Sequence, residues 1–469
     1  MIGHSWPEYV FIRLSVSALR LVAPLSIVYL AASWRAGTFL WSPLFGVYAL
    51  IETPFFLLVY LPRRSRLQRD AKHPPRMSRA ERDALFHNCA NSMTPESITN
   101  WFIRAPGLRV LRDNVADWLL WALFSARSNE VLEEWEEELD YYISVMGNYV
   151  GYPIDRGSIP EMQCFRLTFD PVHMVHRPFI WYMIVGFVDT LTSTSLYLHG
   201  FTHYNTRKWF HSFPPRPLLA LFSRPSTDTV TNLLYWYRPH RSSTKLPILF
   251  IHGVGIGIYP YVTFLSEIAA QDPDVGILAV ELLPISARIT APPLARDAVC
   301  EAIIRILNAH GLDRVVVMGH SYGTVVASYL LRRQLVLLSD PIPFLLHHPA
   351  VAYNFVYRHP REASEWQIWY FASRDPDTSR ALSRHLFWFE SILFREDVVG
   401  AGRAGEENKP RVAVSLGGCD QLIDAHAVRT YLTGGEEEQR VLYFPEFDHA
   451  SLFHSRSGRA ALLDVLSRF

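Results

Sequence analysis

A serine flanked by two glycines is the feature of this sequence that most directly suggests chemistry. Ser321 stands in the pentapeptide Gly-His-Ser-Tyr-Gly, between Gly319 and Gly323. The apolar run before it is typical of a buried strand, and residues 324–332 after it are typical of a helix. A nucleophilic serine must stand clear of a sheet on a sharp turn, and flanking glycines allow the close packing that this turn imposes. The pattern therefore predicts a nucleophile at Ser321.

Two later segments could supply the acid and the base that such a serine needs. Asp420 follows a strand-like run and the turn Gly-Gly-Cys, and His449 follows the last strand-like run. A histidine can take the serine proton, while a carboxylate fixes the imidazole tautomer and stabilises the imidazolium. Asp424 and Asp340 are alternatives for the acid, and His454 is an alternative for the base.

The order of serine, acid and histidine resembles that of the α/β-hydrolase superfamily, over about residues 230–469. The resemblance implies that an oxyanion hole is formed by two backbone N–H groups. One belongs to Tyr322, and the other to Val254 in the loop that begins with His252 and Gly253. Losing one such donor costs ~3–4 kcal/mol of transition-state stabilisation. Nothing in the sequence indicates a metal or an organic cofactor.

The elements that must position these residues are read from the hydrophobic pattern after residue 231. Short apolar runs alternate with helical segments, which predicts an α/β fold with a mostly parallel sheet. Runs that are apolar throughout fit strands covered by helices on both faces. We expect strands at residues 233–237, 247–252, 276–283, 314–319, 344–348, 411–416 and 440–444.

An insertion at about residues 350–410 separates two of these predicted strands, where the family that the sequence resembles places its lid. Aromatic side chains in such a segment form helix cores or bind apolar groups over a pocket. The insertion predicts a hydrophobic ester or lipid as the substrate and leaves ester, thioester and amide open. Its aromatic residues are Trp366, Trp369, Tyr370, Phe371, Phe387, Trp388, Phe389 and Phe394.

Residues 10–33 and 38–61 are apolar runs, each longer than the ~20 residues that cross a bilayer. We expect them to anchor the chain in a membrane, as two spans or as a hairpin that dips into one leaflet. Arg13 can reach the interface, but Arg20 and Glu52 are less easily placed. An ionised side chain at mid-bilayer costs at least ~2.5 kcal/mol on insertion scales, and a hairpin relieves this cost.

A basic run follows the second apolar segment, whereas the turn between the segments offers only Arg35. By the positive-inside rule, residues after 62 face the cytosol, and the basic run can contact anionic headgroups. The endoplasmic reticulum membrane or a lipid droplet suits this geometry. The run consists of Arg63, Arg64, Arg66, Arg69, Lys72, Arg76, Arg79 and Arg82.

The pattern divides the chain into an anchor (1–62), a basic linker with a helical region (63–224) and a catalytic domain (225–469). Helices are expected at residues 95–102, 114–124 and 130–145, with the acidic run at 133–138 on a solvated face. A third apolar stretch at 179–201 contains Asp189 and several hydroxyl residues. We expect it to be buried or interfacial rather than to span a membrane.

Lys+Arg and Asp+Glu both number 45, so no global charge draws the chain to nucleic acid. The sequence predicts a membrane-associated serine hydrolase of the esterase or lipase type, acting in lipid metabolism. The alternatives are a non-catalytic membrane scaffold that retains the fold, and an acyltransferase or thioesterase that uses the same three residues. A transporter is disfavoured because the apolar segments offer no polar pathway.

Overall fold

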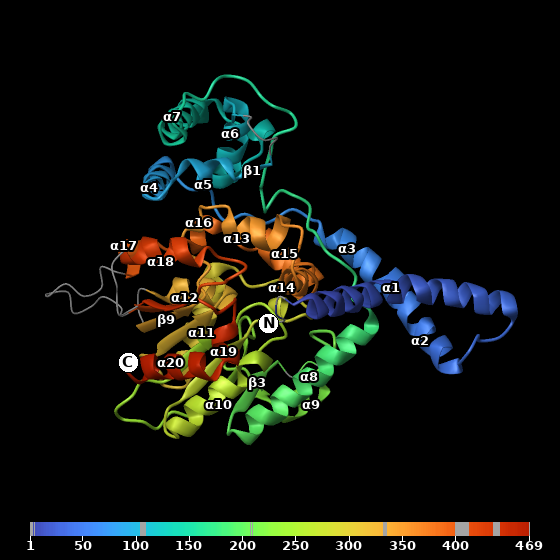
Figure 1. The fold of residues 1–469 in the computed structure, drawn as a ribbon. Helices are drawn as coiled ribbons and strands as arrows, with labels where there is room; N and C mark the ends of the chain where they lie inside the picture. Colours follow the sequence, from blue (N-terminus) through green and yellow to red (C-terminus); the bar gives the residue numbers. More distant parts are fainter. Residues whose placement is uncertain are drawn as a thin grey trace.

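A computed structural model describes residues 3, 5–103, 109–206, 208, 210–331, 335–398, 412–434 and 441–468. Figure 1 shows a central sheet flanked by helices, a helical lobe on one side of it and a helical hairpin that projects from the body. The predicted elements that reach residues 332, 411 and 440, and the last part of the predicted insertion, extend outside the described residues.

A nine-stranded sheet forms the centre, in the order β11-β10-β9-β8-β6-β7-β5-β3-β4. Neighbouring strands from β11 to β7 are parallel, whereas β5 is antiparallel to both β7 and β3. The predicted α/β fold with a mostly parallel sheet is therefore confirmed. The strands are β3 (Thr202–Asn205), β4 (Arg224–Pro225), β5 (Leu234–Arg238), β6 (Ile248–Ile251), β7 (Ile277–Glu281), β8 (Val316–His320), β9 (Leu335–Ser339), β10 (Val412–Gly417) and β11 (Val441–Phe444).

The sheet departs from the prediction at two places. The strand predicted at residues 344–348 is wrong, because β9 fills the position between β8 and β10 and residues 344–348 form a turn. Both runs are apolar, but only β9 is followed directly by an acidic residue at the carboxyl edge of the sheet. The sheet also begins at Thr202, upstream of the predicted start of the catalytic domain at residue 225.

Helices cover both faces of the sheet, which explains why its strands are apolar throughout. Leu249 and Ile251 face the core that includes α11, α12 and α18, whereas Phe250 faces the core that includes α10, α19 and α20. These helices are α10 (Val262–Gln271), α11 (Arg296–Ala309), α12 (Tyr322–Leu330), α18 (Ala425–Thr433), α19 (Ser451–His454) and α20 (Arg456–Ser467).

The two predicted apolar segments form the projecting hairpin (Figure 1). The first is α1 (Trp6–Ala36); the second runs through α2 (Pro43–Pro54), a π-helical stretch (Phe55–Tyr60) and α3 (Leu61–Leu67). These helices and α8 (Phe179–Leu198) are long and apolar enough to cross a membrane.

Two arginines of α1, Arg13 and Arg20, face the insertion that precedes β10. The Arg13 guanidinium lies 3.9 Å from the Trp366 ring centroid, and that of Arg20 lies 5.9 Å from the Trp369 ring centroid. Ile12 and Val16 pack on the same segment, which includes Tyr370. Phe371 packs against the same cluster. Four aromatic residues of the predicted lid, Trp366, Trp369, Tyr370 and Phe371, thus contact α1 rather than line a pocket. The insertion forms α13 (Ala350–Ala352), α14 (Ala363–Ile368), α15 (Pro376–Arg384), α16 (Trp388–Ser391) and α17 (Arg395–Val398).

Glu52 of the second segment is also turned inward and is fully buried. Its carboxylate accepts hydrogen bonds from the Tyr48 hydroxyl at 2.9 Å and from the backbone N–H of Phe179 at 2.7 Å. The Nε2 atom of His176 lies 2.8 Å from the same carboxylate. Glu52 therefore caps the first turn of α8, where backbone N–H groups lack intrahelical acceptors.

The helical lobe has an apolar core of its own. The helices predicted in this region are confirmed, and Thr94 caps α5 as the Thr-Pro-Glu sequence indicates, although α5 ends at Thr99. The lobe comprises α4 (Arg79–Ala90), α5 (Pro95–Thr99), β1 (Phe102–Ile103), α6 (Arg112–Leu119), α7 (Glu133–Val150) and β2 (Gln163–Cys164).

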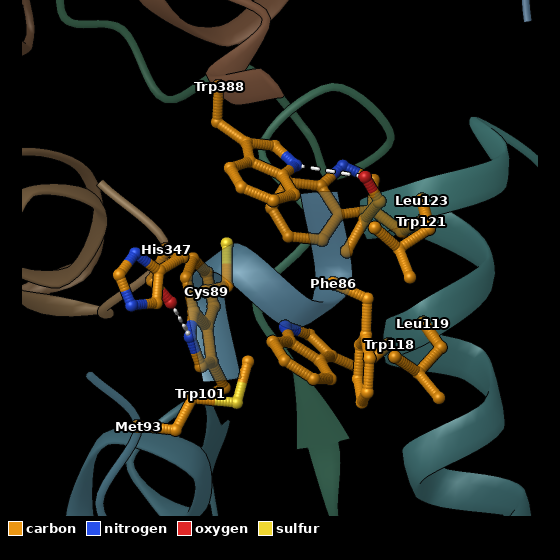
Figure 2. A pocket seen from close by; sticks show the side chains of 11 residues that line it. Phe86, Cys89, Met93, Trp101, Trp118, Leu119, Trp121, Leu123, His347 and Trp388 are labelled. Carbon is orange, nitrogen blue, oxygen red and sulfur yellow. Dashed lines mark hydrogen bonds between the residues drawn. The ribbon is translucent and has the colours of Figure 1, made fainter. Parts of the chain in front are cut away.

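Tryptophans join this lobe to the insertion, as Figure 2 shows. The Trp101 indole N–H donates to the carbonyl oxygen of His347 at 2.9 Å, and the Trp388 indole N–H donates to that of Ala122 at 2.9 Å. The aromatic side chains between them leave a small cavity of about 20 Å³. The hydrogen bonds fix the lobe over the carboxyl edge of the sheet.

One acidic residue of α7 departs from the prediction of a solvated face. Glu138 is buried and accepts two hydrogen bonds from the Arg82 guanidinium, at 2.8 and 2.6 Å. The Tyr142 hydroxyl donates to it at 2.8 Å. The neighbouring Glu137 is exposed, as predicted. Glu138 therefore joins α7 to α4 through an ion pair inside the lobe.

We expect Glu138→Gln to lower the free energy of unfolding by about 3–5 kcal/mol, because it leaves the buried Arg82 charge without its counterion. The matched control is Glu137→Gln, one residue earlier on the solvated side of α7, which should change stability little. Chemical denaturation of both variants measures the difference. Equal stability of the two variants would contradict a buried pair.

Candidate active site

Ser321 lies on the turn between β8 and α12, at the carboxyl edge of the sheet. Its backbone φ of 50° and ψ of −121° are unusual for a residue with a side chain, and the residue is only 3% exposed. The Ser321 N–H donates to the carbonyl oxygen of Ser339, at the end of β9, at 3.0 Å. A strained residue of this kind persists only where surrounding structure holds it in place.

The glycines around Ser321 are required by close approach of the backbone. A Cβ atom on Gly323 would lie 2.1 Å from the carbonyl oxygen of Ile251, and one on Gly319 would lie 2.7 Å from that of Gly323. A Cβ atom on Gly253 would lie 2.9 Å from the Ser321 Cβ atom. A side chain at Gly323 would push α12 away from β6, and one at Gly319 or Gly253 would displace the turn that carries Ser321, which we call the elbow.

The structure brings together the three residues that the sequence singled out. The Nε2 atom of His449 lies 2.8 Å from the Ser321 Oγ atom, and its Nδ1 atom lies 2.6 Å from Asp420 Oδ2. The other carboxylate oxygen of Asp420 accepts the backbone N–H groups of Leu422 at 2.7 Å and Ile423 at 3.0 Å. With its proton on Nδ1, the imidazole can accept the serine hydroxyl proton.

Two of the alternatives that the sequence left open, Asp424 and His454, lie away from the serine. Asp424 is exposed and caps α18, where its carboxylate accepts the N–H of Ala427 at 2.9 Å. His454 is exposed at the end of α19. Asp420 and His449 are therefore the acid and the histidine that the fold aligns with the serine.

Asp340 is a second buried carboxylate, beside the hydrogen-bonded residues Ser321, His449 and Asp420. It accepts the N–H of Gly417, on β10, at 2.9 Å and that of Ala450, next to His449, at 3.1 Å. The His320 Nε2 atom lies 3.5 Å from it. Asp340 thus ties the histidine loop to the sheet, a role that sequence reasoning missed. Asp340 directly follows the apolar run that forms β9, and this position could have indicated that it lies at the carboxyl edge of the sheet. The strand was instead expected at residues 344–348.

Ligand atoms of Asp340, Asp420 and His449 lie within 4.8 Å of one another, close enough to share a cation. The Asp420 oxygens already accept two backbone N–H groups and contact the imidazole, and the Asp340 oxygens accept two more N–H groups. This arrangement fits a hydrogen-bond network around an imidazole better than a metal site, whose carboxylates must direct lone pairs at the ion.

The loop after β6 lies against the elbow and is held by side chains. The Nε2 atom of His252 accepts the N–H of Leu282 at 2.9 Å, and Nδ1 lies 2.8 Å from the carbonyl oxygen of Gly253. Burial lowers the pKa of His252, which favours the neutral ring that these bonds require. The Tyr261 hydroxyl accepts the Gly253 N–H at 3.2 Å and lies 2.7 Å from Nδ1 of His320.

The two residues expected to form an oxyanion hole flank the serine from either side. Val254 follows Gly253 in the loop that approaches Ser321, and Tyr322 is the first residue of α12. The first N–H groups of a helix have no intrahelical acceptor and can bind a negative oxygen. Both backbone N–H groups thus belong to segments that lie beside the nucleophilic position.

The same segment of the chain is recognised by comparison with known proteins. Residues 248–456 match the model of the alpha/beta hydrolase family. This part of the chain has the α/β-hydrolase fold. The matched residues contain the serine, the aspartate, the histidine and the loop after β6, and we call the sheet with its helices the hydrolase domain.

Similar solved structures include a bacterial membrane phospholipase A, at 14% identity over 62% of this chain and 94% of that chain, with a TM-score of 0.37. A carboxylesterase from the thaumarchaeon Nitrososphaera gargenis is 14% identical over 51% of this chain and 97% of that chain, with a TM-score of 0.36. A putative lipase from Acinetobacter baumannii is 12% identical over 59% and 97%, with a TM-score of 0.37. No curated protein matches the sequence.

A large cavity of about 670 Å³ lies beside the elbow, the turn that carries Ser321. Tyr322 and Val326 of α12 form one wall, Leu282 and Ile285 after β7 form another, and Phe387 of the insertion contributes an aromatic ring. Phe387 is thus a predicted lid residue that does face this cavity. The lining combines these apolar side chains with charged ones, namely Lys72, Lys208, Glu281, Arg296, Asp297 and Glu390, of which Lys72, Lys208, Arg296 and Asp297 are exposed.

Charges around His449 change its protonation. Burial alone lowers the pKa of the imidazole, but the nearby carboxylates of Asp420, Asp340 and Asp448 outweigh burial and raise the pKa to about 9. Burial likewise raises the pKa of Asp340, yet His320 and His449 outweigh this effect and hold it below its ordinary value. The imidazolium is therefore well stabilised at this position.

We expect Asp340→Asn to lower the pKa of His449, because it removes one carboxylate that favours the charged ring. Since the folded-state pKa of about 9 exceeds the ordinary 6.5, protonated His449 contributes stability below pH 6.5, and that contribution disappears as the pH rises through 9. Nuclear magnetic resonance titration of the ring measures both values. Asp424→Asn is the matched control, and an equal pKa in the two variants would contradict the role of Asp340.

Proposed function

We propose that this chain is a membrane-associated serine hydrolase that cleaves a hydrophobic ester through an acyl-enzyme on Ser321. The observation that carries the proposal is the hydrogen-bonded line from the Ser321 hydroxyl through His449 to Asp420, with the serine on a strained turn. This arrangement is what activation of an alcohol as a nucleophile requires.

In the proposed reaction, the Ser321 oxygen attacks the ester carbonyl carbon while His449 takes the hydroxyl proton. The N–H groups of Val254 and Tyr322 stabilise the negative oxygen that develops on the carbonyl. The bond to the leaving alcohol then breaks as His449 returns the proton to that alcohol. Water, deprotonated by the same histidine, releases the acid from Ser321 and restores the enzyme. Asp420 holds the ring and stabilises its charged form.

The apolar wall near Tyr322 supports a substrate with a hydrocarbon acyl group. Leu282, Ile285, Val326 and Phe387 offer no charge to an acyl chain, and such pockets bind apolar groups through burial. A lipid ester fits this lining better than a small charged ester does. A thioester would undergo the same attack, since the steps above need only an electrophilic carbonyl and a leaving group.

The hairpin of α1 and α2 is the proposed membrane anchor, with the hydrolase domain on the cytosolic side at the endoplasmic reticulum or a lipid droplet. Three members of the basic run are engaged within the protein, because Arg63 pairs with Asp377, Arg76 with Glu130 and Arg82 with Glu138. The exposed Arg64, Arg66 and Arg69 remain next to the hairpin, where basic residues set orientation.

We expect a fluorophosphonate probe to label purified protein covalently at Ser321, because a serine bonded to a histidine is activated toward phosphorus electrophiles as it is toward carbonyls. Mass spectrometry of the digested adduct identifies the labelled residue, and Ser321→Ala is the control. Folded protein that carries no label, or carries it on another serine, would rule out the proposed nucleophile and favour a scaffold.

Hydrolysis of a medium-chain ester should fall by about 10³-fold or more in Asp420→Asn, because residues that act as a unit with the nucleophile lose most of the rate when one is changed. Asp424→Asn is matched in chemistry and lies in the same loop, and asparagine caps helices as well as aspartate does. It should retain the rate. If Asp424→Asn were the crippling change, the assignment of the acid would be wrong.

A further inference from the structure

Helix α8 is inverted relative to an ordinary surface helix, because its apolar side is exposed and its acidic residue faces the protein. Phe187 is 65% exposed and Leu198 is 81% exposed, whereas Tyr182, Val185 and Leu196 are buried. The exposed apolar residues recur at helical spacing along one side. They are Ile180, Met183, Ile184, Phe187, Leu191 and Leu198, which we call the outer face of α8.

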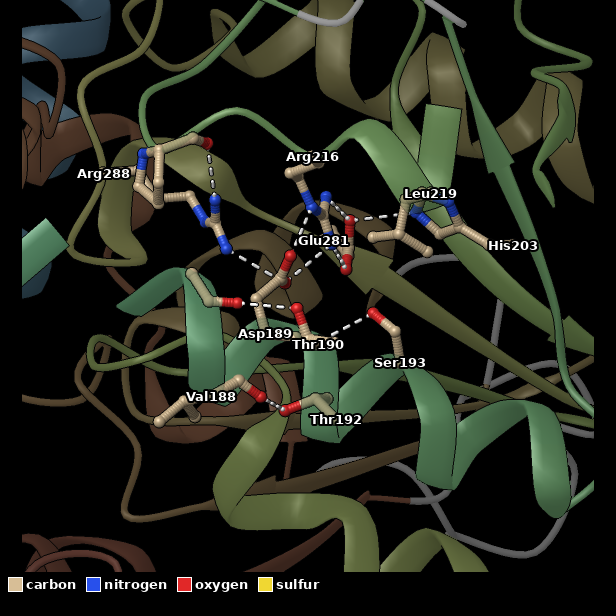
Figure 3. Close-up of polar contacts among 12 residues, drawn as sticks. Val188, Asp189, Thr190, Thr192, Ser193, His203, Arg216, Leu219, Glu281 and Arg288 are labelled. Carbon is tan, nitrogen blue, oxygen red and sulfur yellow. Dashed lines mark hydrogen bonds and ion pairs between the residues drawn. The ribbon is translucent and has the colours of Figure 1, made fainter. Parts of the chain in front are cut away.

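The acidic residue of α8 is neutralised inside the molecule, as Figure 3 shows. Asp189 binds the Arg216 guanidinium through two hydrogen bonds of 2.9 Å, and Arg288 lies 3.0 Å from it. Arg216 also binds Glu281 at the end of β7, at 2.7 and 2.8 Å. A helix crossing a bilayer on its own would have to give up these buried ion pairs, so they hold α8 on the hydrolase domain.

Four hydroxyl groups of α8 donate hydrogen bonds within the helix. Thr190, Thr192, Ser193 and Thr194 each donate to the carbonyl oxygen four residues earlier, at 2.7–2.9 Å. Two of them, Thr190 and Thr194, are exposed on the same side as the apolar residues. The hydroxyl groups of Thr190 and Thr194 can therefore meet hydrocarbon without being left unsatisfied.

The start of α8 packs against the hairpin, and a second short helix exposes further apolar residues. Phe55 of the hairpin packs against Phe179, Tyr182 and Phe213, with ring centroids 5.6 Å apart in each pair. On the far side, α9 (Pro217–Phe222) follows Arg216 and exposes further apolar side chains. These are Leu218, Leu221 and Phe222.

The cavity beside the elbow opens next to this surface. Lys208 and His211 both line the cavity, and Phe210 between them is 81% exposed. This segment leads directly into α9, and Glu281, which binds Arg216, is also part of the cavity wall. The segment around Phe210 therefore borders both the apolar surface and the cavity, and the ion pair between Arg216 and Glu281 connects α8 to the cavity wall.

We propose that the outer face of α8, with α9 and Phe210, lies in the interface of a lipid bilayer and that the cavity receives its substrate from that bilayer. A bilayer is the occupant because α8 packs against a hairpin long and apolar enough to cross one, and because the exposed Thr190 and Thr194 hydroxyl groups already bond within the helix. The second part rests on the proposed hydrolase function, whereas the first part does not.

The contact is tested with the full chain reconstituted in phosphatidylcholine vesicles, carrying a benzoylphenylalanine photocrosslinker at position 187. We expect lipid adducts at this position. Position 44, in the hairpin and 80% exposed, is the positive control. Position 132 is the matched negative control, because Leu132 is an exposed apolar residue where α7 begins, on the opposite side of the molecule in Figure 1. A crosslinked dimer of the chain, or adducts at 44 without adducts at 187, would overturn the proposal.

Delivery from the bilayer is tested by the variants Phe187→Asp and Leu191→Asp, with Leu132→Asp as the control. A charge in the interface weakens contact with lipid, so we expect hydrolysis of a long-chain ester embedded in vesicles to fall by about tenfold or more. Hydrolysis of a water-soluble short-chain ester should be retained. Equal losses on both substrates would overturn delivery from the bilayer. If the parent chain cleaved neither ester, the proposed function would fail, while the crosslinking result would stand.

Discussion

The site depends on how closely the first turn of α12 approaches β6. Gly323 packs so tightly on the carbonyl of Ile251 that a single added carbon would lie 2.1 Å from the carbonyl oxygen. This contact forces Ser321 into its strained conformation and lifts its side chain off the sheet. The hydrogen bond from Ser321 N–H to Ser339 then fixes the elbow to the neighbouring strand. The serine therefore reaches His449 because of backbone packing, and not because of its own conformational preference.

Around His449, two carboxylates serve different purposes. Asp420 contacts the ring, whereas Asp340 binds the N–H of Ala450 and so holds the loop that carries the ring. The same carboxylate binds Gly417, which fixes β10 and thereby the start of the turn that leads to Asp420. One buried charge thus positions both partners of the serine, and it adds to the field that stabilises the imidazolium.

The features of this arrangement that depend on local sequence could be predicted, whereas those that depend on contacts between distant residues could not. The elbow, Asp420 and His449 could be predicted because a glycine-flanked serine and the strand before each residue are local signals. The true position of β9 could not be chosen from two apolar runs of similar length. Asp340 was therefore considered only as an alternative acid, and its role in holding the histidine loop was missed. Glu138 seemed solvated because its partner Arg82 is remote in sequence. The aromatic residues near Trp366 were expected over a pocket, and nothing local indicated that α1 would cover them.

Hydropathy gives the length of an apolar segment but not the direction of its polar residues, and that direction determines how the segment can meet lipid. Arg13, Glu52 and Asp189 would each be costly in hydrocarbon. Each instead meets a partner within the protein, namely Trp366, the first turn of α8 and Arg216. Arg13 thus attaches α1 to the insertion, Glu52 attaches the second segment to α8, and Asp189 attaches α8 to the hydrolase domain. The apolar helices therefore pack as one unit with the insertion that supplies Phe387 to the cavity wall.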